Sequence, residues 1–178
     1  MTETIAGDGF RLRRATADDI DFALELASHE DVDPYLRAVR PGREDLLQEI
    51  EKSLAEPEKS GRFVLEVYEG EWRRAGVLGF DVANKRSRIA NLGGLAIHPD
   101  FRGRHLADEA ARVFQRHLLL DLDFHRLQLE IYGFNERAIK HAERAGFIRE
   151  GVKRKAYWRH DEWVDGVLFG LVREDLEP

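Results

Sequence analysis

A basic turn that contains glycine is the segment of this chain best suited to bind a charged ligand. It reads Arg102-Gly103-Arg104-His105-Leu106-Ala107, follows an apolar stretch that ends at Ile97, and leads directly into a helical pattern. The N-terminus of a helix leaves backbone N–H groups unpaired and carries the positive end of the helix dipole, so it favours anions. Two arginines add positive charge. These residue types in this order predict a pyrophosphate site.

Two widespread nucleotide-binding motifs are missing from the sequence. It contains no Gly-x-Gly-x-x-Gly and no Gly-Lys-Ser/Thr. Rossmann and P-loop sites depend on those motifs to bring the backbone close to phosphate groups. Both classes of site are therefore excluded, and the arginine-glycine turn remains the candidate.

The turn lies between a predicted strand and a predicted helix. Residues 88–97 are typical of a strand, and Gly93-Gly94 within it indicates a bulge or a place where another group packs on the backbone. After the turn, apolar residues recur at helical spacing from Leu106 to Leu119. Residues 126–132 predict a further strand, and Asn135 is a typical N-cap for the short helix that follows it.

The remaining segments predict a mixed sheet with helices. A helix starts at Thr16, Pro34 interrupts that region, and a second helix after Pro41-Gly42 carries an apolar face from Leu46 to Leu54. Because these helices precede a run of strands, the order favours a mixed α/β sheet over a doubly wound parallel one. The other predicted strands cover residues 10–13, 62–68, 72–82, 147–157 and 162–172, and the last two are joined around Arg159-His160-Asp161.

Composition narrows the function classes. The chain has no cysteine, which excludes disulfides, a thiolate nucleophile and a Cys-type zinc site. The net charge of −6 argues against a general nucleic-acid binder. It suits a cationic substrate such as an amine, but it is explained as well by solubility alone. Residues 1–6 lack the pattern of a secretory signal, and no apolar run approaches about 18 residues, so we expect a cytoplasmic protein without a membrane partner. The scattered histidines predict no metal site.

The segment from Leu92 to Phe147 resembles the GNAT acyl-CoA N-acyltransferases, and the chain is most similar to their RimJ/RimL-like branch. The family turn reads Arg/Gln-x-x-Gly-x-Gly/Ala, and five of the six positions fit here. His105 stands where glycine is usual, and its Cβ takes room beside the pyrophosphate and adds strain if φ is positive. The imidazole either swings outward or lowers the affinity for the cofactor. Further markers are 135–138, 142–147 and the chain ending from Glu150.

The resemblance implies a fold and a co-substrate. The fold is α/β (mixed α+β): one domain over residues 1–178, with a core of about 10–175 and a central, mostly antiparallel twisted sheet of about 6–7 strands flanked by helices. A splayed strand pair lies at the cofactor site. The co-substrate is acetyl-CoA, with no metal, and a homodimer is expected. The residues expected to contact the cofactor are Leu95, Ala96, Ile97, Arg102, Gly103, Arg104, His105, Leu106, Ala107, Asn135 and Arg144.

The implied chemistry is direct attack of a primary amine, from a protein N-terminus or a small molecule, on the acyl thioester. Many relatives carry a glutamate on the strand before the turn, and a serine or tyrosine three or seven residues after the asparagine. Here the strand has no acid, and the other two positions are Ala138 and Ala142. The expected catalytic residues are Asn135 beside the pantetheine arm, Tyr157 as the acid and Glu130 as the base, with Tyr132 and Glu150 as further candidates. The structural alternatives are packing for the tyrosines and an ion pair with a neighbouring arginine for Glu130. An enzyme that mainly positions its reactants could also work without a strong acid or base.

Two other functions stay open. A non-catalytic acyl-CoA-binding regulator or scaffold would explain His105, Ala138 and Ala142, and an interaction module would use the helix around Leu46 to Leu54. Three other groups of residues have structural interpretations. Arg11, Arg13 and Arg14, and the cluster 153–155, are expected on solvated faces. Trp158 and Trp163 are expected to be buried, and contact with an acceptor or a second subunit is the alternative.

Overall fold

The computed structural model describes residues 3–32 and 41–176. The interruption predicted at Pro34 lies outside these residues. The strands form one sheet in the order β1-β2-β3-β4-β5-β6-β8-β7. They are β1 (Thr4–Ala6), β2 (Phe10–Arg14), β3 (Ser60–Tyr68), β4 (Trp72–Asn84), β5 (Ile89–Ile97), β6 (Arg126–Tyr132), β7 (Ile148–Arg159) and β8 (Glu162–Val172). The helices are α1 (Ile20–Ser28), α2 (Arg43–Ala55), α3 (Leu106–Arg116) and α4 (Glu136–Arg144), with short helical turns η1 (Ala17–Asp19), η3 (Pro99–Phe101), η4 (His117–Asp121) and η5 (Arg173–Asp175).

The sheet is mixed and mostly antiparallel, which confirms the predicted fold class. Among the described residues, β5 and β6 are the one parallel pair of neighbours. The sheet has eight strands, where the resemblance implied six or seven. The additional strand is the three-residue β1, which pairs with β2 from Thr4↔Arg13 to Ala6↔Arg11 and is too short to give a periodic pattern.

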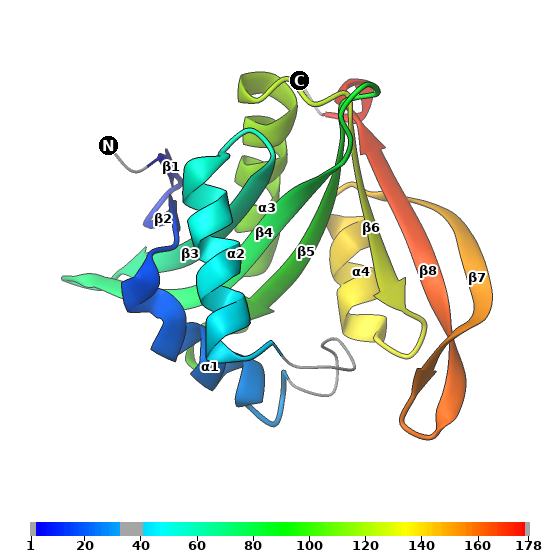
Figure 1. Cartoon of the computed structure of the whole chain (residues 1–178), viewed down its shortest axis with the longest axis horizontal. Coiled ribbons are helices and arrows are strands. Elements are labelled where there is room, and N and C mark those ends of the chain that lie inside the picture. The colour runs from blue at the N-terminus through cyan, green and yellow to red at the C-terminus, as the bar shows by residue number, and fades with distance from the viewer. Residues whose placement is uncertain (1–2, 33–40, 177–178) are drawn as a thin grey trace.

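Alternation along the central strands divides the core into two layers. Phe63 and Leu65 of β3 belong to the large cluster that includes Phe114 of α3, and Phe63 meets Phe114 edge to face at 5.2 Å. Val64 points to the opposite face and joins the smaller cluster with Ile50 of α2. Figure 1 accordingly shows α2 in front of the sheet and α3 behind it. Period-two burial therefore fixes which helix covers which face.

The β5 and β6 strands separate soon after they start. Their parallel ladder covers Ile89–Asn91 and Arg126–Gln128, and no further pairs join them in the described chain. Figure 1 shows them side by side at the top of the view and apart at the bottom. On its other edge β5 has a bulge opposite Val77 and Gly79, where Gly94 has φ +67. The predicted splay and the predicted bulge at Gly93-Gly94 are both confirmed.

Arg14 does not lie on a solvated face, so the prediction is wrong for this residue, whereas Arg11 and Arg13 are partly exposed. Arg14 is 3% exposed and donates to the Ser53 Oγ at 2.9 Å and to the carbonyl oxygens of Pro57 and Ser60. These bonds tie β2 to the end of α2. The sequence could not reveal them, because the partners lie 39 to 46 positions away.

The two tryptophans of the last hairpin are not buried as predicted. Trp158 is 54% exposed and Trp163 is 58% exposed, and their rings meet edge to face at 5.2 Å. They flank a two-residue turn in which His160 and Asp161 both have positive φ, the geometry of a type I′ hairpin. Each ring is therefore packed against the other and still open to solvent.

None of the helices in the described ranges is both long and apolar enough to cross a membrane.

Candidate active site

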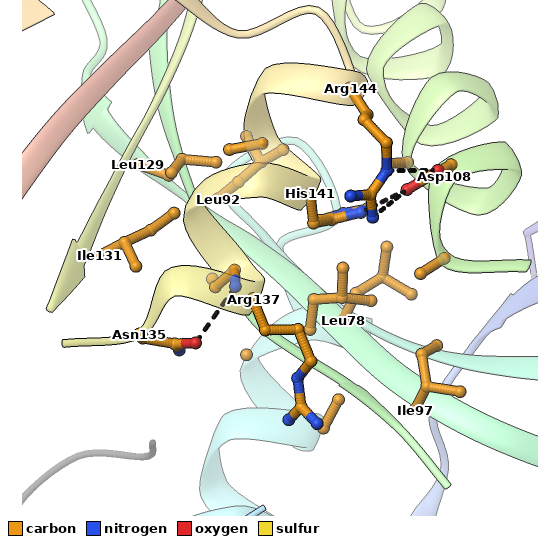
Figure 2. Close-up of a pocket in the computed structure, with 18 of the residues that line it drawn as sticks. Leu78, Leu92, Ile97, Asp108, Leu129, Ile131, Asn135, Arg137, His141 and Arg144 are labelled. Carbon is orange, nitrogen blue, oxygen red and sulfur yellow. Dashed lines mark hydrogen bonds and ion pairs between the residues drawn. The ribbon is translucent and has the colours of Figure 1, made fainter. Parts of the chain in front are cut away.

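One cavity of about 920 Å³ lies where β5 and β6 separate, bounded by the turn after β5, the first turn of α3, and α4 (Figure 2). Leu95, Ala96 and Ile97 line it from β5. Except for Arg104, every residue expected to contact the cofactor lines this cavity, and so do Glu130 and Tyr157. The lining from the turn and the helices is Arg102, Gly103, His105, Leu106, Ala107, Asn135 and Arg144.

The backbone of the turn is set by two residues with positive φ. Gly103 has φ +75, and an added Cβ would meet nothing within 4 Å there. His105 has φ +56 and is the N-cap of α3, without a side-chain capping bond. Because φ is positive, the backbone of His105 is strained at this position, where the family has glycine. The His105 side chain is exposed, and the first backbone N–H groups of α3 start directly after it.

The two arginines of the turn have different surroundings. The Arg102 Nε donates to the Ile97 carbonyl oxygen at 3.2 Å, and its Nη1 lies 3.4 Å from the Asp31 carboxylate. Arg104 lies outside the cavity lining and pairs with Glu69 at 2.6 Å. Arg102 is therefore the arginine of the turn that faces the cavity.

A third arginine lies near Arg102, and its role escaped the sequence analysis. Arg137, in the first turn of α4, lines the cavity and donates to the Asp31 carbonyl oxygen at 3.2 Å. Burial and the positive charge of Arg137 both lower the pKa of the Arg102 guanidinium. Figure 2 shows Arg137 extending from α4 across the cavity. Two neighbouring guanidinium groups at one cavity favour an anion with more than one charge.

The helical spacing of basic residues on α4 is the signal that could have found Arg137. Arg137, His141 and Arg144 are separated by four and three positions, so they share one face of the helix. Asp108 of α3 faces this stripe: its carboxylate accepts from the Arg144 Nε at 2.9 Å and lies 2.7 Å from the His141 Nδ1 (Figure 2). The hydrogen bond from Arg144 is the main cause that lowers the pKa of Asp108, and His141 adds to it.

Asn135 caps α4 as predicted from the sequence. Its side-chain oxygen accepts a hydrogen bond from the Ala138 N–H at 3.1 Å. Asn135 also lines the cavity, between the basic stripe and the end of β6 (Figure 2). Capping and exposure to the cavity are thus combined in one side chain.

The opposite end of the cavity carries a carboxylate and a phenol. The Tyr157 hydroxyl donates to the Glu130 Oε1 at 2.6 Å, and the Lys153 Nζ donates to the Oε2 at 2.8 Å. The bond to Glu130 is the main cause that raises the pKa of Tyr157. The Tyr132 ring packs edge to face on Tyr157 at 5.4 Å and also lines the cavity.

The other acid considered for catalysis is held elsewhere. Glu150 forms a two-pronged ion pair with Arg126, with distances of 2.7 and 2.5 Å, and it does not line the cavity. Within residues 3–32 and 41–176, no three His, Asp or Glu side chains are grouped so that they could hold a metal ion.

Different parts of the cavity can bind different chemical groups. Backbone N–H groups at the start of α3, with Arg102 and Arg137, can bind a polyanion. The edge of β5 that faces the splay is unpaired with β6 beyond Asn91 in the described chain, so its backbone can bind an extended ligand. Glu130 can accept a proton, and Tyr157 can donate one.

Comparison with known proteins agrees with this geometry. Residues 10–148 match the family model described as an acetyltransferase (GNAT) domain. Over 83 residues the chain is 32% identical to the SPbeta prophage-derived uncharacterized N-acetyltransferase YokL of Bacillus subtilis (strain 168). That match covers 47% of each chain, so it spans about half the length of the curated relative.

Solved structures extend the likeness of fold to nearly the whole chain. Spermidine N-acetyltransferase from Vibrio cholerae, in complex with CoA and spermine, has a TM-score of 0.83 at 18% identity and covers 95% of this chain and 98% of its own. Ribosomal-protein-S5-alanine acetyltransferase from Vibrio fischeri has a TM-score of 0.82 at 16% identity and covers 99% and 100%. With the family model matched over most of its length, the chain belongs to the GNAT acetyltransferase family.

Proposed function

We propose that this protein transfers the acetyl group of acetyl-CoA to a primary amine by direct attack within a ternary complex. The observation that carries the proposal is one continuous cavity of about 920 Å³, which reaches from the cationic turn to the Glu130–Tyr157 pair. A cofactor with phosphates at one end and a thioester at the other can therefore meet an amine without leaving the protein.

The residues present fit CoA. Arg102, Arg137 and the backbone N–H groups of the first turn of α3 would hold the pyrophosphate, because the two guanidinium groups repel one another until an anion lies between them. The pantetheine arm would follow Leu95, Ala96 and Ile97 along the unpaired edge of β5 and pass Asn135. An added Cβ at Gly93 or Gly94 would meet nothing within 4 Å, so the face of β5 is uncovered at these two residues. Acetyl-CoA supplies the activated acyl group.

The side chains at the other end would handle protons. A primary ammonium has a pKa of about 10.4, so it must lose a proton before it can attack. Glu130 is the acceptor for that proton, directly or through water. The Tyr157 hydroxyl is the donor for the departing sulfur, since a phenol is protonated at neutral pH. Backbone N–H groups of β5 on the splayed side lie where an oxygen that gains negative charge can be bound.

Within the family, we propose a branch and a class of acceptor for this protein. Likeness of fold to a ribosomal-protein-S5-alanine acetyltransferase and to a spermidine N-acetyltransferase supports the RimJ/RimL-like branch and an amine acceptor, either a protein N-terminus or a small molecule. The cytoplasmic location and the homodimer stay predictions.

Calorimetric titration with acetyl-CoA, followed by thiol release across a panel of primary amines, tests the function. Binding with turnover supports the enzyme and identifies its acceptor class. Binding without turnover on any amine favours a non-catalytic acyl-CoA-binding regulator, a function that Ala138 and Ala142 also support because neither can donate a proton. Absence of binding contradicts the CoA site.

A further inference from the structure

A primary amine of the protein itself already lies on the carboxylate at the amine end of the cavity. The Lys153 Nζ is 2.8 Å from the Glu130 Oε2, while the Tyr157 hydroxyl holds the other oxygen at 2.6 Å. Glu130 lines the cavity, and Lys153 does not. The lysine thus reaches a cavity carboxylate from outside the cavity.

A glycine of β8 leaves the space that the carboxylate occupies. An added Cβ at Gly166 would come within 2.1 Å of the Glu130 Oε1 and 2.8 Å of the Tyr157 ring. Gly166 is the partner of both Tyr132 and Lys153 in the sheet. The carboxylate therefore lies directly against the backbone, and Tyr157 blocks one of its oxygens. Only its Oε2 side is left for a cation.

The ion pair between Lys153 and Glu130 is weak. Its side chain is 50% exposed and that of Glu130 is 27% exposed, and exposed ion pairs of this kind are worth at most about 1 kcal/mol. The pairing of β7 with β8 shifts register between Lys153 and Tyr157, and β7 is an edge strand, so solvent can receive the lysine when it leaves. A competing ammonium can therefore displace it.

We propose that the Glu130 Oε2 is the binding subsite for the ammonium group of the acceptor and that Lys153 is its built-in occupant, which the acceptor displaces. The ligand class follows from the occupant: an unhindered primary alkylammonium whose nitrogen ends a methylene chain, as in lysine. This subsite rests on the proposed function, because it gives the amine its place in the ternary complex.

Binding of n-butylammonium chloride, the equivalent of the lysine side-chain end, tests the subsite without acetyl-CoA. Titration at constant ionic strength is followed by NMR through the Gly166 amide and the Tyr157 ring. Lys153→Met keeps the side-chain length and removes the amine, so its affinity should rise roughly two- to fivefold over the wild type, the range set by an exposed ion pair. Lys155→Met, two positions along the same strand, is the matched control and should match the wild type.

Two further comparisons make the test decisive. Glu130→Gln should abolish the shifts at Gly166 and Tyr157, and tetramethylammonium chloride, which has charge but no N–H group, should produce none in the wild type. Equal affinity in Lys153→Met and Lys155→Met would overturn the proposal, and so would shifts that map away from Gly166 and Tyr157. Failure of the proposed function is a separate result, since it is recorded as absent acetyl-CoA binding or absent turnover.

Discussion

The two ends of the cavity are built in opposite ways. The cationic end depends on a contiguous turn, 102–107, followed at once by the helix that supplies its N–H groups. The acidic end depends on β6, β8 and the edge strand β7, whose side chains meet across 23 to 27 positions of sequence. A ligand site made from consecutive residues is visible in a sequence, whereas one made by strand pairing depends on register.

The electrostatics of the two ends differ in the same manner. Near the turn, burial and Arg137 lower the pKa of Arg102, which marks an excess of positive charge. At the other end, a hydrogen bond to Glu130 raises the pKa of Tyr157, which indicates a negatively charged hydrogen-bond acceptor. The cavity therefore favours an anion at one end and a cation at the other, the charges of a CoA pyrophosphate and an ammonium group.

The variant with the largest expected effect should slow catalysis at the acidic end and leave cofactor binding at the cationic end unchanged. Tyr157→Phe keeps the ring and removes the hydroxyl, so kcat should fall by about 10²- to 10⁴-fold, the range for loss of a proton donor. The dissociation constant for acetyl-CoA should stay within about twofold, because the turn is untouched. Steady-state kinetics and calorimetry measure the two values. A parallel loss of affinity would show that the two ends are not independent.

The two arginines of the turn give the next effect in size and form a matched pair. Arg102→Ala should weaken CoA binding about 10- to 100-fold, the value of a hydrogen bond with a charged partner. Arg104→Ala should change affinity by less than about twofold, because Arg104 pairs with Glu69 outside the cavity. The double variant should resemble Arg102→Ala. Equal losses in the two single variants would contradict the assignment of Arg102 as the cavity arginine.

The fold could be predicted to the extent that its signals are local. Apolar periodicity gave the strands and helices, and Gly93-Gly94 gave the bulge that the structure confirms at Gly94. The three-residue β1 was missed because it is too short to show a period. Arg14 was misplaced because a charged side chain in sequence gives no sign of carbonyl groups that will surround it after folding.

The residues of the site could likewise be predicted where their signals are local in the sequence. Ten of the eleven residues expected to contact the cofactor line the cavity, and the exception, Arg104, has its guanidinium bound to Glu69, 35 positions away. Arg137 could have been found from its spacing to His141 and Arg144. Gly166 could not, because its role is to leave room for Glu130, and nothing in the local sequence records which strand lies beside it.

A smaller effect is expected where the cationic end is joined to the core. Asp108→Asn should lower the free energy of unfolding by about 1 to 2 kcal/mol, because it weakens the bonds to Arg144 and His141 that join α3 to α4. The folded pKa of Asp108 is lowered from 3.8, so this contribution is present above the unfolded pKa and is lost as pH falls through the folded pKa.

Urea unfolding of both proteins between pH 2 and 7 measures that contribution. The difference between wild type and Asp108→Asn should be constant above about pH 5 and shrink below about pH 4. A difference that stays unchanged down to pH 2 would mean that the carboxylate charge is not what joins the two helices. Arg112→Ala, also on α3, is a suitable control, since Arg112 donates to the Arg144 carbonyl oxygen at 3.3 Å and this bond involves no carboxylate.

The smallest expected effect is that of replacing His105, a position where the family pattern and the positive φ both favour glycine. Its φ of +56 costs a side chain with a Cβ about 1 to 2 kcal/mol, and glycine is free of that cost but gains about 0.4 to 1 kcal/mol of entropy when unfolded. His105→Gly should therefore raise the free energy of unfolding by about 0.5 kcal/mol and leave CoA affinity equal or tighter. Calorimetry and thermal unfolding measure both. A severe loss of affinity would mean that the imidazole contacts a phosphate, and the cationic end would then be built from side chains more than from backbone.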